Sequence, residues 1–123
     1  MIHEGQVVLT SFPNTDFSMA KLRPVLLLRR ASVRYNDWLV CMVSSQVWPA
    51  EADWDEIIFS DDRDFSGTGL KVSSVVRLSR LAVLDDGLFV GSMGAIGSDR
   101  LDRIRQRLAI WMMGETAREK TGF

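Results

Sequence analysis

Apolar residues in this chain fall into short runs that are separated by polar turns. The runs cover 6–12, 25–30, 38–43, 56–59, 74–78, 81–84 and 88–96, and they are rich in Val, Ile and Leu. Runs of this length and composition are typical of β-strands. Pro24 opens the second run, where a missing N–H is tolerated, and the nearly unbroken apolar stretch after it predicts a central buried strand.

The pattern changes to helical spacing near the end of the chain. Ser98 is expected to be the helix N-cap, with acidic residues at 99 and 102 at the positive end of the dipole and Gly114 at the stop. The residues that share one face are Leu101, Ile104, Leu108, Trp111 and Met112. This face is expected to be core, although Trp111, Met112 and Met113 could instead contact a second subunit. Many short strands followed by one helix predict a small barrel or a strongly bent sheet with a helix packed on it.

Turn signals divide the strands further. Residues 65–69 are glycine-rich and predict a loop, and Asp85-Asp86-Gly87 predicts a hairpin-type turn between the last two strands. With 123 residues, the chain is expected to be a single domain over 1–123, with a core of about 4–113 and a polar tail at 114–123.

Composition narrows the possible chemistry. There is one cysteine, Cys41, and one histidine, His3, so a Cys/His zinc cluster or a two-histidine metal site cannot form within one chain. No metal and no cofactor is expected. Cys41 lies in an apolar run, and we interpret it as a buried structural thiol rather than a nucleophile.

Net charge and hydropathy set limits on partners and location. A net charge of −1 argues against a protein that coats nucleic acid along its backbone, but an enzyme can still bind a few phosphates in a local patch. No apolar run reaches the roughly 18 residues of a membrane span, and no signal peptide is visible. A cytoplasmic protein without a membrane partner is expected.

The loop between the first two strands ends in Lys21-Leu22-Arg23-Pro24. Arg23 therefore stands at the mouth of a buried strand, and a planar, permanently charged guanidinium at a rigid position is well suited to holding a phosphate. The alternative is that Arg23 caps the strand or pairs with Asp16.

Three segments carry a family resemblance. Residues 5–28 resemble the opening of the MazF/PemK (Kid) growth-inhibitor toxins, in which a glycine and an apolar strand lead through Phe-Pro to Arg-Pro and a second strand. Residues 40–46 are similar to the second motif of that family, and residues 69–84 to the third. The order and spacing of the motifs extend the resemblance over residues 4–112.

The resemblance implies an SH3-like small barrel of the kind shared by the MazF/PemK and CcdB plasmid maintenance toxins. It also implies a homodimeric, metal-independent endoribonuclease that cleaves single-stranded RNA by attack of the 2′-hydroxyl and is inhibited by a cognate antitoxin. Arg23 takes the position of the family's arginine. Ser44 takes the position of its threonine, which keeps the hydroxyl and loses the methyl group that restricts χ1.

Further residues are candidate RNA contacts. Asp16 could accept a proton or simply form a turn, and Arg77 could extend the groove or pair with Asp61, Asp62 or Asp64. Trp48 and Trp54 could stack on bases, receive a partner helix or belong to the core. The remaining candidates are Ser18, Lys21, Ser45 and Gln46.

Three functions are compatible with these features. The leading one is a sequence-selective endoribonuclease of a type II toxin–antitoxin pair. A CcdB-like topoisomerase poison would share the fold but would not need the phosphate-binding features. An inactive dimeric binding module is favoured by the net negative charge, by serine in place of threonine and by the altered first loop.

Overall fold

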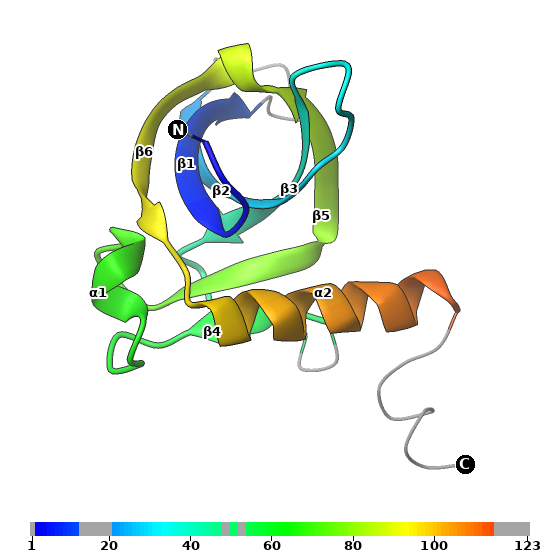
Figure 1. Cartoon of the computed structure of the whole chain (residues 1–123). Helices are drawn as coiled ribbons and strands as arrows, with labels where there is room; N and C mark the ends of the chain where they lie inside the picture. Colours follow the sequence, from blue (N-terminus) through cyan, green and yellow to red (C-terminus); the bar gives the residue numbers. More distant parts are fainter. Residues whose placement is uncertain (1, 13–20, 48–49, 52–53, 115–123) are drawn as a thin grey trace.

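A computed structural model describes residues 2–12, 21–47, 50–51 and 54–114. It contains a six-stranded antiparallel sheet with the strand order β4-β5-β3-β2-β1-β6. The strands are β1 (Gln6–Phe12), β2 (Lys21–Arg30), β3 (Asp37–Ser44), β4 (Glu56–Ile58), β5 (Ser74–Asp85) and β6 (Phe89–Ala95). Figure 1 shows that the sheet curls on itself and that α2 (Ser98–Met112) lies across its open side. The predicted strongly bent sheet with a C-terminal helix is confirmed.

The apolar run in β2 is buried on both faces of the sheet. Val25 and Leu27 belong to one hydrophobic cluster and Leu26 and Leu28 to the other, as the alternation of side chains along a strand requires. β2 lies between β1 and β3, so the prediction of a central strand is confirmed. It begins at Lys21, before the expected start at Pro24. Pro24 is tolerated because pairing with β3 begins only at Val25.

One long strand replaces two predicted ones. Cys41 of β3 pairs with Leu81 and Met42 pairs with Arg77, so three residues of β5 have no counterpart on β3. This irregularity bends β5, because the unmatched residues leave the ladder. Asp55 holds the bend, since its Oδ1 accepts the Leu78 N–H at 3.2 Å.

Two local predictions are wrong. The expected hairpin at 85–87 is a 3₁₀ turn (Asp86–Leu88), and β6 does not pair with β5 but crosses over to β1. The expected loop at 65–69 contains the short helix α1 (Phe65–Thr68). It ends at Gly69, whose φ is +76°, and an added Cβ there would lie 2.2 Å from the Met93 carbonyl oxygen. Glycine is therefore required at this close approach.

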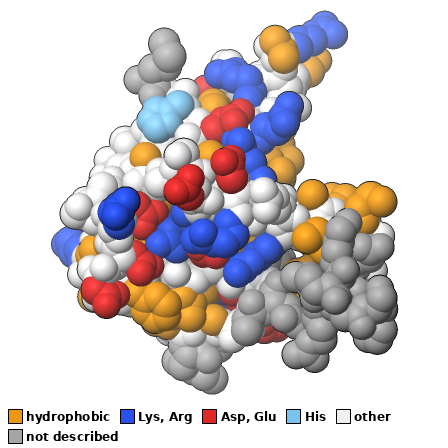
Figure 2. Space-filling model, turned by 60° about the horizontal axis from the view of Figure 1, so that its bottom comes forward, with side chains coloured by type: hydrophobic (Ala, Val, Ile, Leu, Met, Phe, Trp, Pro, Cys, Tyr) orange, Lys and Arg blue, Asp and Glu red, His pale blue; other side chains and the backbone are white. Residues whose placement is uncertain are grey.

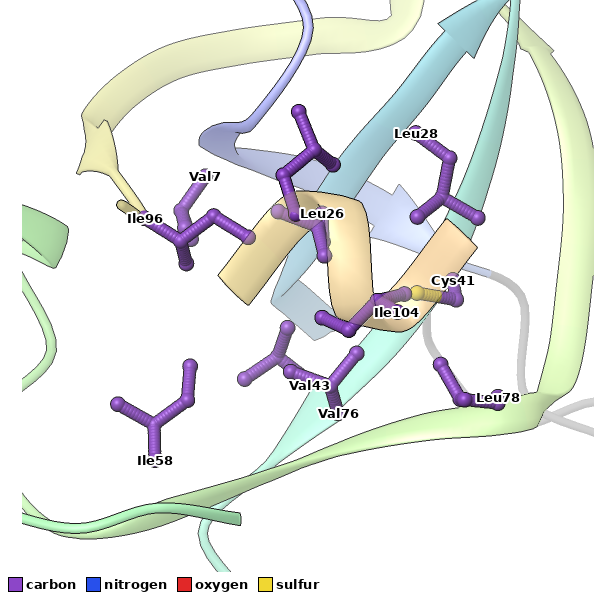
Figure 3. Packing of buried hydrophobic residues seen from close by; sticks show 11 residues of the cluster. Val7, Leu26, Leu28, Cys41, Val43, Ile58, Val76, Leu78, Ile96 and Ile104 are labelled. Atoms are coloured by element: carbon purple, nitrogen blue, oxygen red, sulfur yellow. The ribbon is translucent and has the colours of Figure 1, made fainter. Parts of the chain in front are cut away.

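The larger hydrophobic cluster lies between the sheet and α2. Figure 3 shows Ile104 of the helix among Leu26, Cys41 and Val76 of three strands. Cys41 is fully buried, and this burial raises the pKa of its thiol far above the ordinary range, with a smaller effect from the charge of Asp55. The prediction of a buried structural thiol is confirmed.

Helix α2 packs as predicted along its first half. Leu101 and Ile104 are buried, but Met112 is 73% exposed and Met113, beyond the helix, 79% exposed. The N-cap is Gly97 rather than Ser98. Asp64 takes the capping role from outside the helix, because its Oδ2 accepts the Gly97 N–H at 2.9 Å.

Candidate functional site

A groove of about 470 Å³ opens at the end of the sheet where β2 begins and β3 ends. Three segments form it: the start of β2, the end of β3, and the connection that leads into β5. The lining residues are Leu22, Arg23, Pro24, Val43, Ser44, Ser45, Gln46, Leu70, Lys71, Val72 and Ser74.

Strand pairing brings the two principal candidates together. In the β2–β3 ladder Val25 pairs with Met42 and Leu26 with Cys41. Arg23 and Ser44 lie two residues beyond the pair of Val25 and Met42, one at the start of β2 and the other at the end of β3. Both side chains are half-buried and both line the groove. Arg23 and Ser44 are 21 residues apart in sequence, but they line the same groove because β2 begins where its antiparallel neighbour β3 ends.

The Ser44 hydroxyl is held in place by the chain that follows it. Its oxygen accepts the Gln46 N–H at 3.1 Å, which is the local bond expected of a serine at a strand end. A hydroxyl has one donor and two acceptor positions, so this bond leaves the O–H for a ligand. Ser45 and Gln46 are exposed and line the same groove.

The third wall contains a cation that sequence reasoning missed. Lys71 is exposed on the connection between α1 and β5, and it lines the groove together with Arg23. Among the described lining residues, Arg23 and Lys71 are the charged ones, and both are cationic. The described lining of the groove is therefore cationic, in a chain whose net charge is −1.

Other candidates lie elsewhere or outside the described residues. Asp16, Ser18 and Trp48 fall outside the described ranges. Lys21 is the first residue of β2, but its side chain is not described.

Arg77 does not line the groove. It forms an ion pair with the buried Asp55, with 3.1 Å between Nε and Oδ2, rather than with any of the three aspartates considered from the sequence. Trp54 is also away from the groove, in edge-to-face contact with Trp111 at 6.4 Å between ring centroids.

A dense ion-pair network joins α2 to β4 and the segment before α1. Arg100 is buried and donates to Glu56, Asp62, both oxygens of Asp64 and the Ile57 carbonyl, at 2.8 to 3.0 Å. All five donors of the guanidinium are thereby used. The Arg100 bonds lower the pKa of Asp64 to about 2, with a further contribution from the Gly97 N–H. Figure 2 shows basic and acidic side chains interleaved over this face.

Two more arginines of α2 belong to this network. Arg103 and Arg107 both contact Glu56, at 2.6 and 3.2 Å. The described residues contain no group of three or more His, Cys, Asp or Glu placed to hold a metal ion. In the same part of the chain, no helix has the length and apolar character of a membrane-spanning segment.

The curled antiparallel sheet, the covering helix and the groove at the strand ends can now be compared with known proteins. Residues 3–112 match the family model described as PemK-like, MazF-like toxin of type II toxin–antitoxin system. The chain therefore belongs to this family. No curated protein sequence matches it.

Solved structures show the same fold. The Mycobacterium tuberculosis toxin MazF-mt6 superposes with a TM-score of 0.63 at 17% identity, covering 85% of this chain and 92% of that one. A structure described as an endoribonuclease in complex with its cognate antitoxin from a mycobacterial species gives a TM-score of 0.64 at 12% identity, covering 92% and 96%. The predicted family resemblance and the PemK/CcdB-like fold are confirmed.

Proposed function

We propose that this toxin is a metal-independent, sequence-selective endoribonuclease that acts on single-stranded RNA in the cytoplasm. The observation that carries the proposal is the groove that Arg23 and Ser44 both line, with Lys71 as a further cation. Membership of the MazF-like family supports the same activity.

The chemistry needs no nucleophile from the protein. The RNA 2′-oxygen attacks the adjacent phosphorus and the bond to the 5′-oxygen breaks, which leaves a 2′,3′-cyclic phosphate and a 5′-hydroxyl. Negative charge on the phosphoryl oxygens grows in the transition state, and Arg23 is placed to stabilise it. The Ser44 O–H donates to the same phosphate and orients it.

Proton transfer completes the reaction. The 2′-hydroxyl must lose a proton and the leaving 5′-oxygen must gain one. Asp16 is the proposed acceptor, because it is the one carboxylate in the loop that leads into β2. The proposed contacts to the RNA strand are Ser18 of this loop, Lys21 at the start of β2, and Ser45 and Gln46 of the groove.

Two partners belong to the proposal. One is a cognate antitoxin protein, supported by the family and by the mycobacterial endoribonuclease solved with its own antitoxin. The other is a second copy of the chain, supported by the exposed apolar end of α2 at Trp111 and Met112. Light scattering on the purified protein tests the second directly.

The decisive experiment is RNA cleavage by the purified protein in excess EDTA. Wild type should give discrete fragments ending in a cyclic phosphate, and Arg23→Ala should lose cleavage by a factor of about 10² or more. The matched control is Arg34→Ala, an exposed arginine in the β2–β3 turn at the opposite end of these strands.

If Arg23→Ala cleaves as well as wild type, the site is assigned wrongly. If folded wild type leaves the RNA intact, the nuclease proposal fails for those RNAs. Topoisomerase binding and an inactive module would then be tested.

A further inference from the structure

The wall of the groove that carries Lys71 is a connection with a fixed backbone. On one side, the Thr68 hydroxyl donates to the Phe65 carbonyl at 2.6 Å and accepts the Leu70 N–H at 3.1 Å. On the other side, the Ser74 hydroxyl donates to the Val72 carbonyl at 2.9 Å. Lys71 is exposed between these two sets of bonds, so its side chain extends into solvent from a backbone that is held on both sides.

Two more contacts attach the connection to the rest of the fold. Ser73 accepts the Ser60 N–H at 2.8 Å, which ties the connection to the turn after β4. Gly69 lies so close to β6 that a Cβ added to it would clash with the Met93 backbone. The wall at 70–74 is therefore held by these contacts as well as by β5, whose Val75 pairs with Ser44.

We propose that Lys71 binds a phosphate of the RNA other than the one that reacts, and so sets how the strand lies across Arg23 and Ser44. This inference rests on the proposed ribonuclease function. A lysine ammonium is a compact charge with three rotatable donors, which suits a phosphate whose orientation need not be fixed. Arg23 presents a planar fork, which suits the phosphate at which geometry matters.

The charges in the groove support separate roles for Lys71 and Arg23. The other described lining residues are uncharged, so an anion at Lys71 meets no carboxylate there. The arginines of α2, by contrast, are matched by Glu56, Asp62 and Asp64. Lys71 is therefore a positioning residue: its loss should weaken RNA binding and raise KM, with kcat at saturating RNA little changed.

The test uses an RNA that wild type cuts, with the 2′-hydroxyl at the mapped cut replaced by 2′-O-methyl so that it binds without reacting. Lys71→Gln should bind more weakly at low salt, and the slope of log affinity against log salt should fall by about 0.7, the value for one phosphate on a single strand. The ratio of wild-type to variant affinity should shrink about 2.6-fold between about 50 and about 200 mM salt. Lys71→Arg should restore the slope, and Arg34→Gln should match wild type.

A phosphate scan locates the contact. Single phosphates of the same oligonucleotide are replaced one at a time by uncharged methylphosphonate. Replacement of one phosphate away from the cut should weaken RNA binding by wild type but not by Lys71→Gln, because the phosphate change and the lysine change remove the same interaction.

The possible failures are distinguishable. If wild type cuts and binds RNA but Lys71→Gln keeps the wild-type affinity and salt slope, the inference is wrong and the proposed function stands. A fall in kcat with unchanged KM would also overturn it, because Lys71 would then act on the reacting phosphate. If wild type neither binds nor cuts RNA, the proposed function fails and the inference with it.

Discussion

Ser44 shows how one side chain can have a structural and a functional bond at once. Its oxygen accepts the Gln46 N–H and so fixes the turn after β3, while its hydroxyl hydrogen remains for a ligand in the groove. A threonine would keep both bonds and restrict χ1 further. The proposed mechanism therefore requires the hydroxyl rather than the particular residue.

Replacing this residue separates the two roles. Ser44→Ala removes the donor to the phosphate, and the expected loss in kcat is about a hundredfold, since one transition-state donor is worth about that much. Ser44→Thr should cleave at least as fast as wild type. The assay is multiple-turnover cleavage of a fluorescent RNA, with Ser66→Ala of α1, an exposed serine outside the groove, as the control. Equal activity of the alanine and threonine variants would remove the hydroxyl from the mechanism.

Individual residues were predicted from sequence where a local pattern sufficed. Arg23 was singled out because it stands at the start of an apolar run, whereas Ser44 was assigned from the family resemblance; both lie at strand ends that line the groove. Lys71 was missed because nothing in its immediate sequence shows that the chain after Gly69 returns to that edge. The Asp55 partner of Arg77 was missed for the same reason, since the contact depends on the bend in β5.

At the scale of elements, α2 is attached to the rest of the protein by its apolar face and by Arg100. The buried guanidinium pairs with three carboxylates, of which Glu56 is buried, and one of its bonds satisfies the Ile57 carbonyl on the outer strand β4. A buried charge that loses its partners is costly, whereas a half-exposed pair contributes little.

Two arginines on the same helix test this difference. Arg100→Met should lower the free energy of unfolding by about 3 to 5 kcal/mol, because Asp62 and Asp64 lose their arginine and the buried Glu56 keeps only the more exposed Arg103 and Arg107. Arg103→Met removes a half-exposed arginine from the same Glu56 and should cost about 1 kcal/mol or less. Urea unfolding followed by tryptophan fluorescence measures both. Similar losses for the two variants would show that burial does not determine the strength of the network.

The same network predicts a dependence on acid. The pKa of Asp64 is about 2 in the folded protein, below its ordinary value of 3.8. The carboxylate therefore adds stability that is fully present above about pH 4 and is lost as the pH falls toward about 2. Asp64→Asn should flatten the fall in urea midpoint over this window, and the exposed neighbour Asp61→Asn should retain it. An unchanged acid profile in Asp64→Asn would contradict the assigned pKa shift.

Element boundaries were predicted correctly where the sequence signal was local and wrongly where they depend on pairing between distant segments. The β2 run was recognised because four consecutive apolar residues are buried on both faces. The polar pair Ser79-Arg80 suggested a break in β5, although these residues form the bend of one continuous strand. Asp85-Asp86-Gly87 gave a correct turn but could not indicate that β6 would cross to β1.

At the scale of the whole molecule, the fold is closed by contacts between its two ends. β1 is paired with β2 on one side and with β6 on the other, and α2 covers the cluster that contains Leu26 and Ile58. Removing the last two elements would expose both the edge of β1 and this apolar cluster to water.

A chain that stops after Leu88 should therefore fail to fold, although it retains Arg23, Ser44 and Lys71. The expected result is the loss of dispersed amide signals in NMR and of RNA cleavage. A chain that stops at Gly114 keeps every described element and should retain both. A folded, active fragment ending at Leu88 would show that closure between β1 and β6 is dispensable.

The pairing of β1 with β6 also determines when the sheet can close during synthesis of the chain. On the ribosome, β1 is among the first segments to emerge, yet its second neighbour is complete only when Ala95 has left the exit tunnel. The groove residues are all synthesised earlier, but the sheet that holds them closes last. If the protein degrades messages, its own translation is nearly finished before it can do so, which leaves an interval in which a co-expressed inhibitor can already be present.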